Sequence, residues 1–372
     1  MTEASPSPSS TKPKPSHRSS EIEGNVEIPI EWYHDWVKEH TTGDDYPQTP
    51  EKVAIITGSN SGTGFWCAKA MVQTGATVVL ACRNLEKANA AKEEILQEFP
   101  NAKLDVLPKA LDTSKLATVR EFAQAFQAKY KRLDWLVNNA GVMALNYSLT
   151  QDGHEIQFQT NHLGHFLLTK LLWSTIMASP QETRIIQHSS SMHSIGAPKF
   201  DSTSMEFPKH GMWAWPIWNV VFPMAGMPKH NWGRYGVSKL SNVLFMKGLE
   251  ERINQFEIIK ASSQEGKILK SIACHPGYAK TQLQLVAAQD GAMGARPVGT
   301  KDGAQSAADG ALPLLMACLS RDINNGDYLG PGNWMKGPPI KSVVRGFGKD
   351  PAQIQSLWEY SEECIGEKFE LA

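Results

Sequence analysis

The sequence predicts an α/β fold with a doubly wound parallel sheet covered by helices on both faces. Three observations support this prediction. From Lys52 onward, short β-branched or apolar runs alternate with longer segments of helical periodicity, as repeated βα units do. Hydrophobic residues make up 41% of the chain and charged residues 20%, which is enough apolar material for a large core. The first apolar run leads directly into a glycine-rich turn.

The elements follow from the period of the apolar pattern. Short apolar runs bounded by turn residues predict strands at 53–58, 77–82, 104–112, 133–141, 184–190, 270–277 and 327–330. Segments with helical spacing predict helices at 64–75, 85–99, 115–130, 161–173 and 235–253. No internal repeat beyond the βα alternation is visible.

The domain organisation is predicted to be one catalytic domain, residues 51–340, with extensions and a long insertion at 196–234. Residues 1–20 are rich in Ser, Pro and Lys with almost no large apolar groups, so a disordered tail is expected. Residues 21–50 form an N-terminal extension, in which Trp32 and Trp36 lie one helical turn apart. We interpret this segment as a short helix packed on the domain in preference to a membrane anchor. Residues 341–372 form a C-terminal extension.

Charge and cysteine usage exclude several classes of protein. The chain has 37 basic and 38 acidic residues, so no general attraction to nucleic acid or an anionic bilayer is expected. Its five cysteines include no CxxC pair and mostly lie in apolar runs, which favours reduced core thiols. No metal site is predicted, since His162 and His165 lack a partner at zinc spacing.

The chain is expected to work in the cytoplasm. No apolar stretch reaches the roughly 18 to 20 residues that span a bilayer, and no apolar secretory segment is visible. The alternative compartment is an organelle, because a Ser-rich, acid-poor N-terminus also suits a transit peptide.

A nucleotide site is predicted at the turn after the first strand. The turn runs from Gly58 to Gly64 and opens a helix, the context in which small residues let backbone N–H groups approach a pyrophosphate. The alternative is a tight strand-to-helix connection without a ligand. The candidate cofactor residues of the turn are Gly58, Ser59, Asn60, Ser61, Gly62, Thr63 and Gly64.

The end of the second strand favours NADP(H) over NAD(H). An NAD-preferring fold usually has an acidic residue there, whereas this chain has Cys82 followed by Arg83 and Asn84. A guanidinium can pair with a 2′-phosphate, although Arg83 can also be interpreted as a solvated residue. Asp112 is expected either to accept a hydrogen bond from the adenine amine or to cap the helix that starts near Lys115.

The end of the fourth strand is expected to border the cofactor's ribose. Asn139, Ala140 and Gly141 form a small-residue turn there, which leaves room for that sugar. Part of the role of Asn139 is predicted to be structural, tying neighbouring strands together.

Over roughly residues 50 to 335 the chain resembles the short-chain dehydrogenase/reductase family, because it has that family's motifs in the same order. These motifs are TGSNSGTG, NNAG, a serine run, Tyr235-Gly236-Val237-Ser238-Lys239 and Pro276-Gly277. The ACRN strand end and the NHLGHF stretch resemble its retinol dehydrogenase and protochlorophyllide reductase branch. The resemblance implies that Asn161 is the helix-kinking asparagine that holds a proton-relaying water. It also implies that Pro276, Gly277 and Thr281 border the nicotinamide.

Tyr235 and Lys239 suit the chemistry of hydride transfer to a carbonyl. A free tyrosine, with a pKa of about 10, gives up its proton reluctantly near neutral pH. Lys239, one turn later, is expected to lower that pKa and to bind the nicotinamide ribose. Ser190 is expected to polarise the substrate oxygen. It is chosen from three consecutive serines because the resemblance aligns it with the family's catalytic serine.

The insertion between Ser190 and Tyr235 is expected to cover a bulky apolar substrate. It is rich in aromatic and thioether side chains, more than a solvated loop needs. The rival interpretations are a dimer contact and a patch that rests on a membrane. Residues 283–302 are expected to act as a lid. The candidate substrate residues are Trp213, Trp215 and Trp218.

We therefore expect an NADP(H)-dependent oxidoreductase that interconverts a carbonyl and an alcohol on a small lipophilic molecule, with a homodimer possible. One alternative is a carbon–carbon double-bond reductase of the same fold. The other is a non-catalytic nucleotide-binding regulatory protein, which has no chemical need for Asn161, Ser190, Tyr235 and Lys239 together.

Overall fold

A single β-sheet runs through the part of the chain that the computed structural model describes, residues 28–41, 48–195, 200, 229–260, 268–289 and 303–371. Its strand order is β3-β2-β1-β4-β5-β6-β7-β8, all parallel except the antiparallel β7–β8 pair. This order confirms the predicted doubly wound sheet. The strands are β1 Val53–Thr57, β2 Thr77–Ala81, β3 Leu104–Asp105, β4 Trp135–Asn138, β5 Thr183–His188, β6 Leu269–Cys274, β7 Tyr328–Pro331 and β8 Pro339–Ser342.

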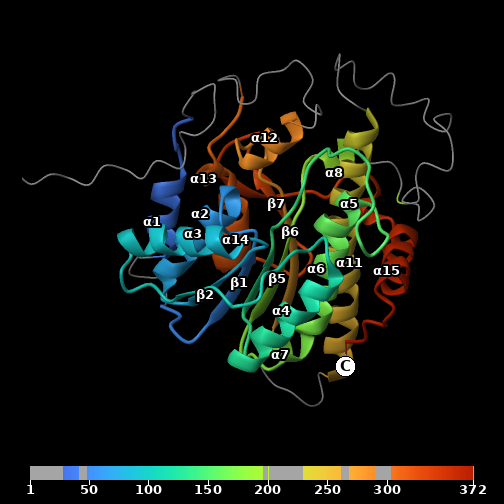
Figure 1. Ribbon diagram of the computed structural model, residues 1–372, viewed down its shortest axis with the longest axis horizontal. Coiled ribbons are helices and arrows are strands. Elements are labelled where there is room, and N and C mark those ends of the chain that lie inside the picture. Colours follow the sequence, from blue (N-terminus) through green and yellow to red (C-terminus); the bar gives the residue numbers. More distant parts are fainter. Residues whose placement is uncertain are drawn as a thin grey trace, which may run out of the picture.

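Helices cover both faces of the sheet (Figure 1). One layer contains α1 Tyr33–Thr41, α2 Gly62–Met71, α3 Leu85–Glu98 and α14 Leu312–Leu319. The other contains α4 Leu116–Lys129, α6 Gly164–Leu171, α7 Trp173–Met177, α11 Lys229–Lys260 and α15 Pro351–Ile365. The shorter elements are η1 Val72–Thr74, α5 Ile156–Phe158, η2 Gln159–Leu163, α8 Met192–Ile195, α12 Gln282–Gln289, α13 Ala307–Gly310 and η4 Gly346–Lys349.

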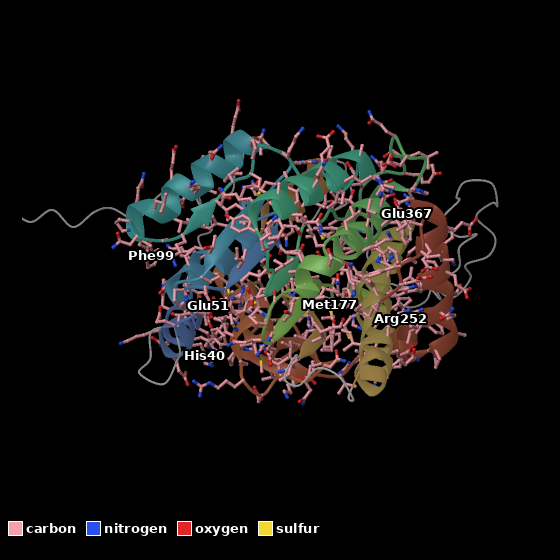
Figure 2. All side chains as sticks on the ribbon, turned by 90° about the horizontal axis from the view of Figure 1, so that it is seen from below. His40, Glu51, Phe99, Met177, Arg252 and Glu367 are labelled. Carbon is pink, nitrogen blue, oxygen red and sulfur yellow. The ribbon has the colours of Figure 1, made fainter. Side chains whose placement is uncertain are left out.

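The sheet separates two hydrophobic cores. Every residue of β1 is buried, and alternate side chains point to opposite faces, so Ile55 joins the core under α4 and α11 while Ile56 joins the core under α2 and α14. A strand buried on both sides needs a continuous apolar run, which explains the VAIIT sequence. The strands begin on the side seen in Figure 2, where Glu51 precedes β1 and Met177 ends α7.

One predicted strand is shorter in the structure, and one observed strand was not predicted. The strand expected at 104–112 is limited to Leu104–Asp105, and beyond it Leu111 N–H donates to Cys82 O at 3.0 Å without forming a ladder. Pro108 lacks the N–H that a continuing ladder needs. The short strand β8 was not expected, because Pro339–Ser342 is a partly exposed edge strand with little apolar character.

Both extensions pack on the domain. The expected N-terminal helix is present as α1, and Tyr33 Oη donates to Trp66 O at 2.7 Å. At the other end of the chain, Trp358 and Phe369 lie in the core beside α11, and the predicted boundary at 340 falls inside β8. The expected disordered tail at 1–20 lies outside the described residues, as does most of the 196–234 insertion. Within the described ranges, no helix is long and apolar enough to cross a membrane.

Candidate active site

The glycine turn between β1 and α2 has the backbone shape that a nucleotide site needs. Gly58 and Gly62 have φ values of 66° and 58°, which favour glycine. A Cβ on Gly64 would lie 2.5 Å from Asn139 Nδ2 and 2.7 Å from Gly58 O. Ser59 is fully buried, and its Oγ lies 3.6 Å from Cys82 Sγ. The turn therefore packs closely on the ends of β2 and β4, and α2 begins within it at Gly62.

The residues expected near the adenosine lie at the ends of β2 and the following segments. Arg83 is exposed just beyond β2. Asn84 caps α3, accepting a hydrogen bond from Lys87 N at 2.8 Å.

Asp112 does not cap α4, so that alternative interpretation is wrong. Its Oδ1 accepts from Ser114 Oγ at 2.6 Å. The α4 cap is supplied from a distant segment, where Asp152 Oδ2 accepts from Leu116 N at 2.9 Å.

Asn139 ties the strand ends together, as anticipated for part of its role. Its Nδ2 donates to Thr57 O at 2.7 Å, while its Oδ1 accepts from Thr63 Oγ1 at 3.0 Å and lies 2.8 Å from His188 Nδ1. Ala140 N donates to Thr57 Oγ1 at 2.8 Å. These bonds fix the end of β4 against the glycine turn.

Gly141 lets the chain pass close to the chemical end of the site. A Cβ at this position would lie 2.9 Å from Asn161 Oδ1 and 3.4 Å from Lys239 Nζ. The structure therefore brings the predicted ribose-side turn together with two of the predicted catalytic residues.

Of the three consecutive serines, Ser190 is the one whose side chain lies near the Tyr235 phenol, where it lowers the pKa of that phenol. Ser189 Oγ instead donates to Lys239 O at 2.7 Å, a bond that fixes β5 to α11. Ser191 contributes its carbonyl to the turn that begins α8, where it accepts from Ser194 N at 3.3 Å. The catalytic role of Ser190 stays a prediction.

Lys239 lies beside Tyr235 but does not donate to the phenol. Its Nζ is 5.9 Å from the Tyr235 ring centroid and donates to His188 O at 2.9 Å. Burial lowers the pKa of Lys239 to about 8 and raises the pKa of Tyr235 to about 12, although Ser190 lowers the latter. This differs from the expected lowering of the tyrosine pKa, because desolvation of the phenol outweighs the effect of its neighbours.

Asn161 lies in the π-turn η2, an irregularity that fits the expected helix-kinking residue. Its side chain accepts from Val142 N at 2.7 Å and donates to Val142 O at 2.9 Å and to Ser238 Oγ at 2.8 Å. Its backbone carbonyl accepts from Asn242 Nδ2 at 2.7 Å. Asn161 thus links the chain after β4 to α11.

The segment after β6 reaches back over the glycine turn. A Cβ added to Gly62 would lie 3.5 Å from Thr281, and the Thr281 hydroxyl donates to Gln284 Oε1 at 2.8 Å. Pro276 O accepts from Gln305 Nε2 at 2.6 Å, and Gly277 has a φ of 62°. These three predicted nicotinamide-side residues lie near the nucleotide turn.

An apolar group that the sequence analysis did not single out surrounds Tyr235. Trp232, one turn earlier on α11, meets the Tyr235 ring edge-on with a centroid separation of 5.8 Å. The sequence signal that could have identified Trp232 was its position one helical turn before Tyr235. The predicted substrate residues Trp213, Trp215 and Trp218 lie outside the described residues. The apolar cluster consists of Met143, Ala144, Met192, Trp232, Tyr235, Leu283 and Ala287.

The residues present fit a nicotinamide nucleotide better than a metal. The backbone of Gly58 to Gly64 can approach a pyrophosphate, and Lys239 supplies an ammonium next to the candidate acid. Among the residues that the structure describes, no group of three or more His, Cys, Asp or Glu side chains could hold a metal ion.

Comparison with known proteins identifies the family of the chain. The sequence pattern described as short chain dehydrogenase matches residues 52–202. Retinol dehydrogenase 13 of Homo sapiens is 36% identical over 250 residues, which cover 66% of this chain and 66% of that protein. The WW domain-containing oxidoreductase of Gallus gallus is 36% identical over 319 residues, or 85% of this chain and 69% of that protein.

A solved structure of an uncharacterised protein from Mycobacterium paratuberculosis has the same fold. It has a TM-score of 0.65, is 28% identical, and the match covers 88% of this chain and 98% of that one. The chain belongs to the short-chain dehydrogenase/reductase family. Within it, the chain lies in the retinol dehydrogenase-like branch, although the match covers just under two thirds of retinol dehydrogenase 13.

Proposed function

We propose that this protein is an NADP(H)-dependent enzyme that interconverts a carbonyl and an alcohol on a bulky apolar substrate, with Tyr235 as the proton donor and acceptor. The observation that carries the proposal is that the Tyr235 phenol lies near Ser190 and that Lys239 Nζ lies 5.9 Å from the Tyr235 ring centroid, beside the turn at Gly141. This combination supplies an acid and a polarising donor for one oxygen atom.

The cofactor would be held by the backbone of Gly58 to Gly64 and by the segment from Pro276 to Thr281. When bound, it supplies or accepts a hydride. Ser190 donates a hydrogen bond to the substrate oxygen, and Tyr235 delivers a proton to the same atom in the reducing direction. Lys239, buried with a pKa of about 8, carries its proton at neutral pH and stabilises the phenolate that remains.

NADP(H) is favoured by the end of β2. Cys82 is buried and has no negative charge at neutral pH, since burial raises the pKa of its thiol. Arg83 is exposed beside it and can pair with a 2′-phosphate. An acidic residue there would repel that phosphate.

An apolar substrate is favoured by the side chains around Tyr235. Met143, Met192 and Trp232 present thioether and aromatic surface beside the phenol, and Leu283 adds aliphatic surface from α12. Such surface stabilises an apolar molecule by about 25 cal/mol per Å² removed from water. The names of the retinol dehydrogenase relatives are consistent with a lipophilic substrate.

The compartment and the assembly are also proposals. We place the enzyme in the cytoplasm, with an organelle as the alternative, and note that one relative, a short-chain dehydrogenase of Brassica napus, is named as chloroplastic. A homodimer is proposed because the 196–234 insertion is apolar.

The direct test is a panel of retinoid, steroid and short aliphatic carbonyls, each assayed with NADPH and with NADH. We expect turnover with NADPH, and the highest kcat/KM for the large apolar compounds. Equal kcat/KM for short and long substrates would contradict the apolar assignment. Light-dependent reduction of a carbon–carbon double bond, without carbonyl reduction, would favour the alternative reductase.

A further inference from the structure

A buried ion pair joins the N-terminal part of α11 to the segment that carries Asn161. Arg234 Nε lies 3.6 Å from Glu155 Oε1, and the two side chains are 14% and 1% exposed. The second Glu155 oxygen accepts from Phe158 N at 2.7 Å and so caps α5, which continues into η2. In the described part of the chain, neither Arg234 Nε nor Glu155 Oε1 has a hydrogen-bond partner.

Polar side chains around the pair connect the same two segments. Arg234 Nη2 donates to Asn231 Oδ1 at 2.7 Å, and Asn231 Nδ2 donates to Asn146 Oδ1 at 3.0 Å. Gln157 Nε2 donates to Asn231 O at 3.2 Å. The guanidinium also lies 5.4 Å from the Tyr147 ring centroid. The start of α11 is thus attached to the 146–157 segment by charge, by amide hydrogen bonds and by an aromatic contact.

The position of this network determines what it can control. Arg234 immediately precedes Tyr235 in the second turn of α11, so a rotation of this part of the helix moves both side chains together. Glu155 begins the helical segment that reaches Asn161 six residues later. A buried ion pair contributes little net stability compared with an apolar replacement, but it enforces one relative arrangement of the groups that carry it.

We propose that Glu155 and Arg234 are positioning residues that hold the Tyr235 hydroxyl in register with Ser190 and with the Asn161 segment. This inference rests on the proposed function of Tyr235. Neither residue touches the reacting atoms in this account, and both act through the two helices that carry them.

The strength of the ion pair should depend on pH, because Glu155 can lose its charge. Burial raises the pKa of Glu155 to about 7, and the Arg234 charge acts in the opposite direction. Burial also lowers the pKa of Arg234, while Glu155 and Tyr147 raise it. Among the described residues, Glu155 and Tyr147 are the titratable groups that face the guanidinium. Since Glu155 loses its charge as the pH falls through about 7, the pair weakens over that range.

The test compares Arg234→Gln, Arg234→Lys and Glu155→Gln with the control Arg252→Gln. Arg252 also lies on α11 (Figure 2), and its guanidinium lies 3.7 Å from the Trp358 ring centroid. It is 17 residues from Tyr235, roughly 25 Å along the helix. The measurements are kcat and KM for a turned-over carbonyl from pH 6 to 9, NADPH affinity, and hydrogen exchange of residues 231–239.

We expect Arg234→Gln to lower kcat by roughly tenfold and Arg234→Lys by less, with NADPH affinity unchanged within about twofold. Exchange of residues 231–239 should rise in Arg234→Gln and not in Arg252→Gln. Glu155→Gln keeps the cap on Phe158 and should lack the decline of kcat below about pH 7 that we expect for the parent.

Parent-like kcat and parent-like exchange in Arg234→Gln would overturn the inference. So would equal losses in Arg234→Gln and Arg252→Gln, because they would reveal only a general effect on α11. If Arg234→Gln does not fold, the same measurements on Glu155→Gln and Arg234→Lys test the inference. Tyr235→Phe with full turnover would refute the proposed function instead, while the exchange data would still report on the ion pair.

Discussion

Arg83 is the residue that we expect to select the phosphorylated cofactor. A guanidinium–phosphate hydrogen bond contributes roughly 1.5 to 3 kcal/mol, so Arg83→Ala should weaken NADPH binding by about 10- to 100-fold. NADH lacks the 2′-phosphate, so its affinity should change little. Fluorescence titration with both nucleotides measures this difference, and Lys87→Ala, a nearby exposed cation, is the control. Equal losses for NADPH and NADH would refute the phosphate-pairing role.

At the residue scale, the identity of the site could be predicted from sequence, but its hydrogen bonds and charges could not. Tyr235, Lys239 and the glycine turn follow from motif and spacing. The cap of α4 by Asp152 could not be predicted, because Asp152 reaches Leu116 only through the tertiary fold. The raised pKa of Tyr235 depends on burial, which no local pattern reports.

Helix α1 is attached through one carboxylate. Asp309 accepts from the backbone N–H groups of Glu31, Trp32 and Tyr33 at 3.0, 2.9 and 3.0 Å, and it is fully buried. Its neighbour Gly310 packs closely on Ala279, near the glycine turn. This bonding satisfies the free donors at the start of α1.

Asp309→Ala should therefore lower the free energy of unfolding by roughly 2 kcal/mol or more, since three buried donors lose a charged acceptor. Hydrogen exchange of residues 31–41 should increase at the same time. Urea unfolding and exchange measure the two effects, with Asp322→Ala, whose side chain is 71% exposed, as the control. Parent-like exchange in α1 would show that apolar packing alone holds this helix.

At the element scale, the predicted strands and helices were found where hydrophobic periodicity is strong. The third strand was overextended because its apolar residues continue past Asp105 while its hydrogen-bond ladder does not. Strand β8 was missed because its pairing with β7 comes from tertiary structure and its sequence is short and partly exposed. Tertiary contacts thus decided the elements with the weakest local patterns.

The whole molecule should lose stability in mild acid because it buries neutral histidines. Burial lowers the pKa of His162 to about 3, of His165 to about 4 and of His275 to about 3. The unfolded chain takes up protons on these residues below about pH 6.5, and the folded chain does not. Stability therefore falls as the pH drops through 6.5, by about 1.4 kcal/mol per histidine at pH 5.5.

The buried carboxyl group of Glu155 has the opposite effect on the pH dependence of stability. Its pKa is about 7 in the folded state and about 4.5 in the unfolded chain, so between these pH values the folded state binds a proton that the unfolded chain does not. This uptake stabilises the folded state by roughly 2 kcal/mol at pH 5.5 and offsets part of the loss from the histidines. We therefore expect a net loss of roughly 2 kcal/mol between pH 7.5 and 5.5 from these four groups. Urea unfolding at the two pH values measures it. A protein as stable at pH 5.5 as at pH 7.5 would contradict the buried, neutral state of the histidines.

The central claim is that the Tyr235 phenol supplies the proton to the reacting oxygen, and turnover of Tyr235→Phe beside its NADPH affinity tests it most directly. Because this change removes only the hydroxyl, we expect kcat to fall by roughly two or more orders of magnitude while NADPH affinity stays within about threefold. A variant that binds NADPH normally and turns over within about fivefold of the parent would contradict the account.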